Sequence, residues 1–400
     1  MYDCTFLCAG YDTLEESASV FIRQEVWQQL EEAKEYARER NHGSNQAYTT
    51  TLGGMEFQIK PHGGAGVTFI LSNDRFTLAI RPSKTPYNLS VTYRARTLWE
   101  YGPEEARKMI WRALDRATCP RPPDQNSDNP EAEITKWRKV SRIDYAFDFH
   151  APEFSEEIAP DMIERVICHS SSKWRWDFKT ADEEGAEIDG YAMGRGGRVQ
   201  TLTVGKKGGL QIQVYKKCEE ITEKSQKTWM YKVWEAVGLE RPASGRHSDI
   251  WRIEVRMGRE FLNDRGVDTV EDFEAQKARV LAEALKSRRL TDKTGDSNRR
   301  RWPVHPMWAQ AIQMADNSMT LIDLRDHVET SGAAAEEKMR QDLKAIMRRQ
   351  HALRIGGDQY DRDSAYGWLV SVLAEMERDD NHHEKMEEYA ERYKYVNCPM

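Results

Sequence analysis

Residues Ser141 to His150 alternate between polar and apolar side chains, which is the pattern of a β-strand with one face on a hydrophobic core. The expected core face is Ile143, Tyr145, Phe147 and Phe149. The opposite face presents Arg142, Asp144, Ala146 and Asp148, so two carboxylates lie on one side of the strand. Two acids on one face suggest a shared hard cation, and therefore a metal-assisted reaction on a phosphate.

Two later segments show the same alternation. Residues 209–216 oppose an apolar set, Leu210, Ile212 and Val214, to a polar set, Gln211, Gln213 and Tyr215. Residues 250–257 oppose Trp251, Ile253 and Val255 to Arg252, Glu254 and Arg256. Each strand alone is typical of a solvated surface, and Glu254 between two arginines is typical of a surface ion network. If the three strands are neighbours in one sheet, their polar faces form a candidate site for a metal ion and a phosphate.

Composition limits the class of protein. The chain has 400 residues, of which 39% are hydrophobic and 31% charged, as in soluble globular proteins. No apolar run is long enough for a membrane span, and no secretion signal begins the chain, so we expect a cytoplasmic protein without a membrane partner. The six cysteines are expected to be reduced structural thiols. The net charge of −7 leaves room for a local basic surface.

The residue patterns along the chain predict both strands and helices. Expected strands are 47–60, 66–72, 75–81, 86–95, 142–149, 200–204, 209–216 and 250–257. Expected helices are 15–40, 103–117, 158–169, 270–287, 306–315, 334–350 and 363–377. An exposed loop is expected at about 119–136 and an irregular segment at 171–198. We therefore expect an α+β domain over residues 1–265, mainly an antiparallel sheet with flanking helices, and an α-helical C-terminal region over 266–400.

Two further patterns leave alternatives open. The glycine-rich stretches Gly194-Arg-Gly-Gly197 and Gly205-Lys-Lys-Gly-Gly209 could hold phosphates through backbone N–H groups, although a hairpin turn also explains the second. The stretch Arg299-Arg-Arg-Trp302 mixes arginines with an aromatic residue, as single-stranded DNA sites do, but such runs are also common on solvated surfaces. Neither glycine stretch ends as a nucleotide-hydrolysing loop does.

The order of several short motifs resembles the Rep_trans family of rolling-circle replication initiators, which occur on plasmids, phages and integrative elements. The resemblance covers about residues 10–310. The matching stretches are Gly10-Tyr-Asp-Thr-Leu14, Leu98-Trp-Glu-Tyr-Gly102, Arg142-Ile-Asp-Tyr-Ala-Phe-Asp148, Thr201-Leu-Thr-Val-Gly205, Val214-Tyr-Lys-Lys217, Trp251-Arg-Ile-Glu-Val-Arg256 and Arg300-Arg-Trp-Pro-Val-His-Pro306.

The resemblance implies an HUH-like nicking domain that cuts and rejoins one DNA strand through a 5′-phosphotyrosine, leaving a 3′-OH that primes synthesis. It implies Mg²⁺ or Mn²⁺ on Asp144, Asp148 and Glu254, and Tyr215 as the nucleophile, with Tyr191 as the second candidate. Expected DNA contacts are Arg142, Lys206, Lys207, Lys217, Arg252, Arg256, Arg299, Arg300, Arg301 and Trp302. Expected partners are origin DNA, single-stranded or supercoiled, a second copy of the chain, and a host helicase or polymerase.

The sequence departs from the family pattern near the expected nucleophile. Thr203 stands where family members often have tyrosine, and Gly205-Lys-Lys207 replaces the usual Gly-Ser-Arg. These departures favour an alternative, a non-catalytic DNA-binding protein of the same fold. The acidic net charge favours a third option, an assembly or interaction protein.

Overall fold

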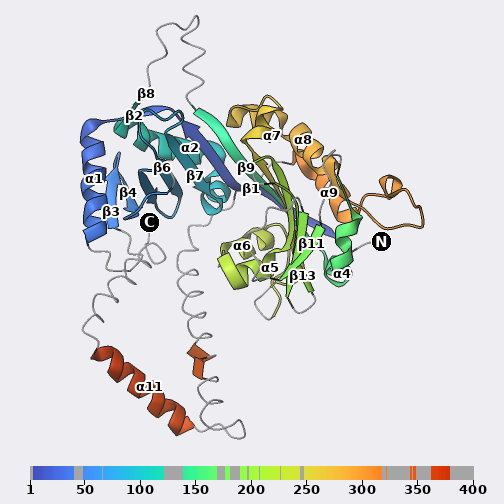
Figure 1. The fold of residues 1–400 in the computed structure, drawn as a ribbon. Coiled ribbons are helices and arrows are strands. Elements are labelled where there is room, and N and C mark those ends of the chain that lie inside the picture. The colour runs from blue at the N-terminus through green and yellow to red at the C-terminus, as the bar shows by residue number, and fades with distance from the viewer. Residues whose placement is uncertain are drawn as a thin grey trace, which may run out of the picture.

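A large sheet organises the molecule. The computed structural model describes residues 3–39, 48–64, 66–120, 138–168, 176–180, 190–195, 198–206, 208–225, 227–243, 247–317, 321, 343–344, 346–347 and 362–378. Within them, twelve strands form one sheet in the order β11-β12-β13-β14-β15-β9-β1-β7-β6-β5-β4-β3 (Figure 1). Their bounds are β1 Thr5–Ala18, β3 Tyr48–Leu52, β4 Met55–Ile59, β5 Phe69–Ser72, β6 Phe76–Ile80, β7 Leu89–Arg94, β9 Arg138–His150, β11 Trp176–Thr180, β12 Gly190–Arg195, β13 Arg198–Gly205, β14 Leu210–Lys216 and β15 Ile250–Gly258.

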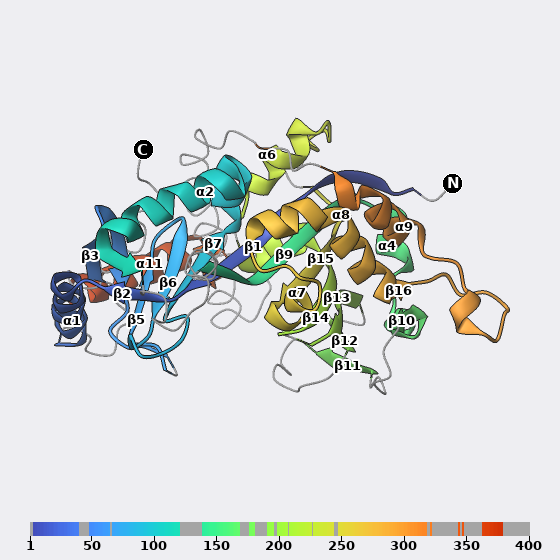
Figure 2. The ribbon, with the colours of Figure 1, turned by 90° about the horizontal axis from the view of Figure 1, so that it is seen from above.

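Neighbouring strands of the sheet are antiparallel, except for the parallel pair β11 and β12. Two small ribbons pair β2 (Val20–Ile22) with β8 (Thr118–Pro120), and β10 (Val166–Cys168) with β16 (Arg288–Leu290). The long strands β1 and β9 lie at the centre and join the two halves of the sheet, which the second view shows along its length (Figure 2).

Helices flank the sheet. The α-helices are α1 Gln24–Glu39, α2 Ala95–Ala117, α4 Pro152–Glu157, α5 Lys217–Glu220, α6 Trp229–Ala236, α7 Arg259–Asn263, α8 Val270–Ser287, α9 Pro306–Gln313 and α11 Arg362–Glu377. Short 3-10 turns are η1 Pro160–Arg165, η3 Arg299–Arg301 and η4 Met314–Asp316, and η2 Ile221–Ser225 is a π-turn. None of the described helices is long and apolar enough to cross a membrane. The expected α+β class, with a mainly antiparallel sheet, is confirmed.

The two faces of the central strands bury different surfaces. The apolar face packs into the main core together with α8 and α9, through residues such as Phe147, Val255, Leu281 and Trp308. A second, smaller core lies on the polar face, where α5 and α6 contribute Cys218, Met230 and Trp234 against Cys8 of β1. The polar face predicted for β9, β14 and β15 is therefore covered by helices and only partly open to solvent.

Two sequence expectations about helices were wrong. Residues 15–18 continue β1, and the helix begins only at Gln24. The alternation in β1 was hidden because Glu16 is a buried position, where Tyr93, Arg107 and Trp111 bond its carboxylate. Pro160 interrupts the helix expected at 158–169, which is instead η1 followed by β10.

The segment expected to be irregular, 171–198, contributes β11 and β12 to the end of the sheet. Most of the loop expected at 119–136 and of the helix expected at 334–350 lies outside the described residues. The helices expected at 270–287, 306–315 and 363–377 are present as α8, α9 and α11.

Candidate functional site

The register of the sheet brings the three polar strand faces together. β14 pairs with β15, and β15 with β9, so the three strands are neighbours. One cross-strand row runs Thr201, Tyr215, Arg252, Asp148 and Cys8. The next row runs Tyr191, Thr203, Gln213, Glu254 and Ala146, and a third runs Gln211, Arg256 and Asp144. Residues directly opposite one another in such rows share a face.

On this face, a tyrosine hydroxyl, that of Tyr215, is hydrogen-bonded to a carboxylate, that of Glu254. The Tyr215 hydroxyl donates to Oε2 of Glu254 at 2.6 Å, and Arg256 Nε donates to Oε1 of the same carboxylate at 2.7 Å. Glu254 is 1% exposed and Tyr215 8% exposed. Burial, reinforced by the charge of Glu254, raises the pKa of Tyr215 well above its usual value of 10. The phenol is therefore neutral in this state and already bonded to a proton acceptor.

Arg252 is the centre of a buried ion-pair network. Its guanidinium donates to both oxygens of Asp148, at 2.6 and 2.8 Å, and to Asp12 at 2.6 Å. Trp234 of α6 adds an indole N–H to Asp148 at 2.9 Å. Both oxygens of Asp148 thus accept hydrogen bonds in this structure, and the fully buried Arg252 faces its acid partners and not a surface where DNA could lie.

Asp144 lies further along β9. Arg142 donates to both of its oxygens, at 2.8 and 2.5 Å. Burial, opposed by Arg142 and aided by the nearby charge of Glu254, raises the pKa of Asp144 from 3.8 to about 7. Four residues of strand separate the Cα atoms of Asp144 and Asp148 by about 13 Å, because each residue advances by about 3.3 Å. The register places Glu254 between them, opposite Ala146.

A pocket of about 370 Å³ opens beside Tyr215. Its walls include both tyrosine candidates, Tyr215 and Tyr191, together with Glu254 and Arg256. Further charged walls come from β1 and from the segment after β14: Asp12, Lys216, Lys217, Glu219, Glu220, Glu223 and Lys227. The lining combines four cations with five carboxylates, so a phosphodiester backbone in this pocket would have to lie against the cations of the wall.

Lys217 lies beneath the candidate nucleophile. Its side chain is 1% exposed, and its Nζ lies 5.5 Å from the centre of the Tyr215 ring and 2.6 Å from Glu220 Oε2. Burial and the nearby Arg252 lower the pKa of this ammonium group. Lys217 was predicted to contact DNA. In the structure it is buried in the wall of the pocket.

Thr203 takes no part in the pocket wall. It is fully buried, and Gln213 Nε2 donates to its hydroxyl at 3.1 Å. The pocket wall carries two other tyrosines: Tyr191, which lies opposite Thr203 in the same row, and Tyr215, which lies in the neighbouring row.

The remaining predicted DNA contacts fall into two groups. Arg142, Arg256 and Lys206 keep some exposure, while Lys207 lies outside the described residues. Arg299, Arg300 and Arg301 are exposed, but Trp302 is only 9% exposed and its indole N–H donates to the carbonyl of Asp296 at 2.7 Å. Trp302 therefore offers no open ring on which a base could stack.

The glycine-rich stretch between β13 and β14 is a hairpin turn. Gly205 pairs with Gln211 and has a φ of +96°, and Gly208 has a φ of +92°. A Cβ on Gly205 would lie 2.1 Å from the carbonyl oxygen of Leu210, so the turn requires glycine there. Part of the stretch Gly194–Gly197 lies outside the described residues.

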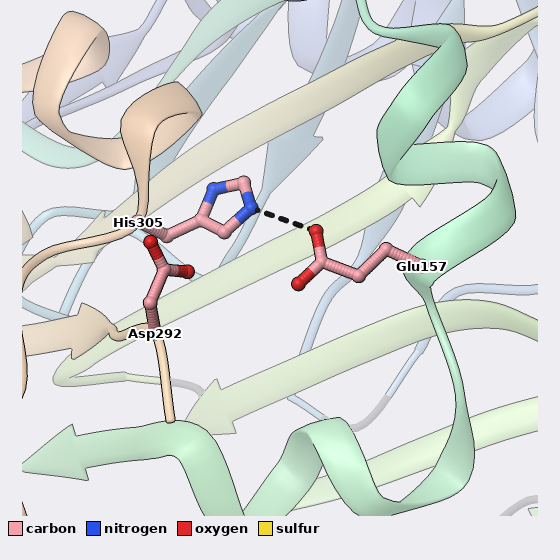
Figure 3. A group of neighbouring side chains, drawn as sticks. All are labelled: Glu157, Asp292 and His305. Atoms are coloured by element: carbon pink, nitrogen blue, oxygen red, sulfur yellow. Dashed lines mark hydrogen bonds and ion pairs between the residues drawn. The ribbon is translucent and has the colours of Figure 1, made fainter. Parts of the chain in front are cut away.

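A separate group of possible metal ligands lies on the opposite side of β15. Among the described residues, Glu157, Asp292 and His305 are the one set of three whose ligand atoms lie within 4.8 Å of one another (Figure 3). Arg165 already bonds both carboxylates, reaching Asp292 Oδ1 at 2.7 Å. His305 accepts from the Met307 N–H through Nδ1, so Nε2 bears the proton and donates to Glu157 at 3.2 Å. The group thus functions as an ion-pair network in this structure.

Sequence reasoning missed Asp12. It occupies a β-bulge of β1, since Tyr11 pairs with Tyr145 and Thr13 with Asp144, leaving Asp12 unpaired between them. The bulge turns its carboxylate toward Arg252 and, at 3.7 Å, toward Lys227. Burial acts to raise the pKa of Asp12, but Lys227 and Arg252 outweigh it and hold that pKa far below its usual range. The only sequence signal was the stretch Gly10-Tyr-Asp-Thr-Leu14.

Comparisons with known proteins add a structural similarity. No protein-family model matches the sequence, and no curated protein is significantly similar to it. The structure is similar to that of a rolling circle replication initiator protein from Geobacillus stearothermophilus, with a TM-score of 0.38 at 13% identity. The similarity covers 79% of this chain and 98% of the other. A TM-score this low supports no assignment by itself, so the functional argument rests on the residues of the site.

Proposed function

We propose that this chain nicks and rejoins one strand of DNA, as initiators of rolling-circle replication do, with Tyr215 as the nucleophile. The observation that supports this most directly is the hydrogen bond from the Tyr215 hydroxyl to Glu254 at the wall of a charged pocket. A nucleophile needs a proton acceptor within hydrogen-bond reach and a cavity for the reacting group, and both are present.

The proposed reaction breaks one phosphodiester bond and forms another. The Tyr215 oxygen attacks the phosphorus, its proton passes to Glu254, and the 3′ oxygen leaves and takes up a proton from solvent or a pocket cation. The product is a 5′-phosphotyrosine and a free 3′-OH, so bond energy is retained for rejoining. Arg256 and Lys227 line the pocket and would balance the phosphate charge.

The residues fit a divalent cation only in part. Asp144 and Glu254 lie close enough for the charge of Glu254 to raise the pKa of Asp144, and such paired buried carboxylates suit a hard cation. Asp148, whose oxygens bond Arg252 and Trp234, fits better as the residue that positions Arg252. A bound Mg²⁺ or Mn²⁺ would supply positive charge to the phosphate. Asp144 and Glu254 remain the proposed ligands, and a bound cation would displace the hydrogen bonds that Arg142 donates to Asp144 and Arg256 donates to Glu254.

The alternative is a DNA-binding protein of the same fold without cleavage activity. It is favoured by the near-complete burial of Tyr215 and by the raised pKa of its hydroxyl, which keep the phenol unreactive in this state. Tyr191 lines the same pocket and is the second candidate nucleophile.

The test is cleavage of supercoiled and single-stranded DNA with Mg²⁺ or Mn²⁺, comparing the wild type with Tyr215→Phe and Tyr191→Phe. We expect nicking with protein attached to the 5′ end, lost in Tyr215→Phe and retained in Tyr191→Phe. The reverse pattern would move the nucleophile to Tyr191. Salt-dependent DNA binding without cleavage of any substrate would establish the non-catalytic alternative.

A further inference from the structure

A basic loop projects from the body of the molecule beyond α9 (Figures 1 and 2). It connects β16 to α9 and includes η3, whose three residues are all arginine. From Thr291 to Val304 the loop has four basic and two acidic residues, a net charge of +2 in a protein whose net charge is −7. The loop is therefore a positive surface on a chain that is otherwise acidic.

The loop is held in one conformation by its own contacts. Its two ends pair through a bridge between Thr291 and Val304, and the Asp292 N–H donates to the Pro303 carbonyl at 2.9 Å. The buried Trp302 ties the inside of the loop through its bond to the Asp296 carbonyl. Asn298 caps η3 by accepting from the Arg300 N–H at 3.2 Å.

The ion-pair network of Glu157, Asp292, His305 and Arg165 anchors the base of this loop. Asp292 lies near the start of the loop, just after β16, and His305 lies at its end, just before α9. Arg165 bonds Asp292 and also donates to the Thr291 carbonyl at 2.8 Å. His305 is fully buried and packs against Phe154 with the ring centres 5.3 Å apart. This network fixes both ends of the loop to α4 and η1.

The arginine side chains of η3 are open to solvent. Arg299, Arg300 and Arg301 are exposed, and the side chain of Arg301 is 69% exposed although it lies 3.2 Å from Asp296. None of the large exposed apolar side chains of the described residues lies between 288 and 304. A membrane surface would need such apolar side chains, and single-stranded DNA would need an open aromatic ring.

We propose that this loop, residues 291–304, is a preformed contact for the phosphate backbone of duplex DNA, separate from the nicking pocket. The inference rests on the proposed function for the identity of the partner. Arginines on a projecting loop can reach the phosphates on both sides of a DNA groove. Because the loop is already ordered before binding, binding costs less conformational entropy. Single strands at the pocket and duplex at the loop would then be held at the same time.

The test uses the loop variant Arg299→Gln/Arg300→Gln/Arg301→Gln. The matched control, Arg23→Gln/Arg112→Gln/Arg116→Gln, removes the same charge from exposed arginines just before α1 and in α2. Binding to a duplex and to a single-stranded oligonucleotide is measured across a range of salt concentrations. Each arginine–phosphate ion pair contributes about 0.9 to the slope of log K against log salt, so we expect the slope for the loop variant to be shallower by about 2 to 3.

We expect the loop variant to bind duplex DNA at least about tenfold more weakly near 0.15 M salt, with single-strand binding and oligonucleotide nicking unchanged. Duplex binding within twofold of wild type, or an equal weakening in the control variant, would overturn the proposal. A wild type that binds duplex but cleaves nothing would refute the proposed nicking function. The comparison of duplex binding between the loop variant and the control would still test the loop.

The anchoring can be tested by Glu157→Gln. This change removes one negative charge near the loop, so electrostatics alone would strengthen duplex binding. Release of the anchor would instead weaken it, and we expect duplex binding to be weaker by about threefold or more. Unchanged or tighter binding by a folded Glu157→Gln protein would refute the role of the network in holding the loop.

Discussion

At the scale of single residues, the candidate site depends on how burial changes the chemistry of Tyr215 and its neighbours. The phenol is neutral, bonded to Glu254, and lies above the buried ammonium of Lys217. The Tyr215 phenol and the Lys217 ammonium would titrate normally in water, and the pKa of each is shifted because burial removes solvent from it. The site is therefore assembled from ordinary side chains in an unusual environment.

Lys217→Met tests the contribution of the buried cation. Removing it takes away a positive charge 5.5 Å from the centre of the Tyr215 ring and leaves Glu220 without its ion-pair partner at 2.6 Å. We expect the single-turnover rate of nicking to fall about tenfold to a hundredfold, as for removal of a charge that stabilises a transition state. Lys216→Met is the control, because Lys216 lies at the pocket but pairs with Asp249. Equal rates for the two variants would contradict this role.

Asp144 makes stability depend on pH in a direction opposite to that of most carboxylates. Its pKa is raised to about 7, so the folded protein keeps a proton that the unfolded chain has released. Stability from this group is therefore greatest at low pH, falls between about pH 4 and pH 7, and is constant above.

The measurement is urea unfolding with a chelator present, for wild type and Asp144→Asn, at pH 5 and pH 8. From pH 5 to pH 8 we expect the free energy of unfolding of the wild type to fall by roughly 1–3 kcal/mol relative to the variant. A difference that stays constant or grows in favour of the wild type would show that Asp144 is ionised throughout this range.

At the scale of elements, register explains why the site forms. The pairing of β14, β15 and β9 aligns Tyr215 with Arg252 and Asp148, and the bulge at Asp12 directs a further carboxylate to the same guanidinium. A shift of one residue in any of these pairings would send the polar set to the opposite face.

Asp148→Asn distinguishes a structural role from a metal-binding role. Arg252 is fully buried, and neutralising its bidentate partner leaves a poorly compensated charge in the core. We expect a destabilisation of about 3 kcal/mol or more without added metal, measured by urea unfolding at pH 7. Full stability in Asp148→Asn, with Mn²⁺ binding alone abolished, would restore Asp148 as a metal ligand.

Alternation in the sequence predicted much of this layer. The strands 209–216, 250–257 and 142–149 and their polar faces follow from a period of two residues. The pattern could not predict partners, because alternation gives the face of a residue and not the distance to its neighbours. That is why Asp144 and Asp148 were assigned to one cation, and why Arg252 was expected at the surface. The bulge at Asp12 and the buried Glu16 break the period, so both escaped prediction.

At the scale of the whole molecule, helices α8 and α9 belong to the core of the sheet. Phe273, Leu281 and Leu285 of α8 and Trp308 of α9 are fully or almost fully buried in the same cluster as the strands. The boundary expected after residue 265 runs through this cluster. The helical expectation for 266–400 described the local structure of α8, α9 and α11 well, but helical periodicity alone does not show which surface a helix packs against.

Truncation tests this division. A chain of residues 1–317 keeps α8 and α9, and we expect it to unfold cooperatively in urea. A chain of residues 1–265 would expose the strand face that Leu281 and Trp308 cover, and we expect it to aggregate or to bind a hydrophobic dye. Cooperative unfolding of the 1–265 chain would support a domain boundary after residue 265.

The most direct test of the proposed chemistry is to locate the covalent bond between protein and DNA. The wild type is incubated with Mn²⁺ and DNA, the complex is digested with protease and nuclease, and the nucleotide-bearing peptide is identified by mass spectrometry. We predict a phosphodiester on Tyr215, in the peptide that contains β14, Leu210–Lys216. An adduct on Tyr191 or on another residue, or cleavage without any adduct, would contradict Tyr215 as the nucleophile.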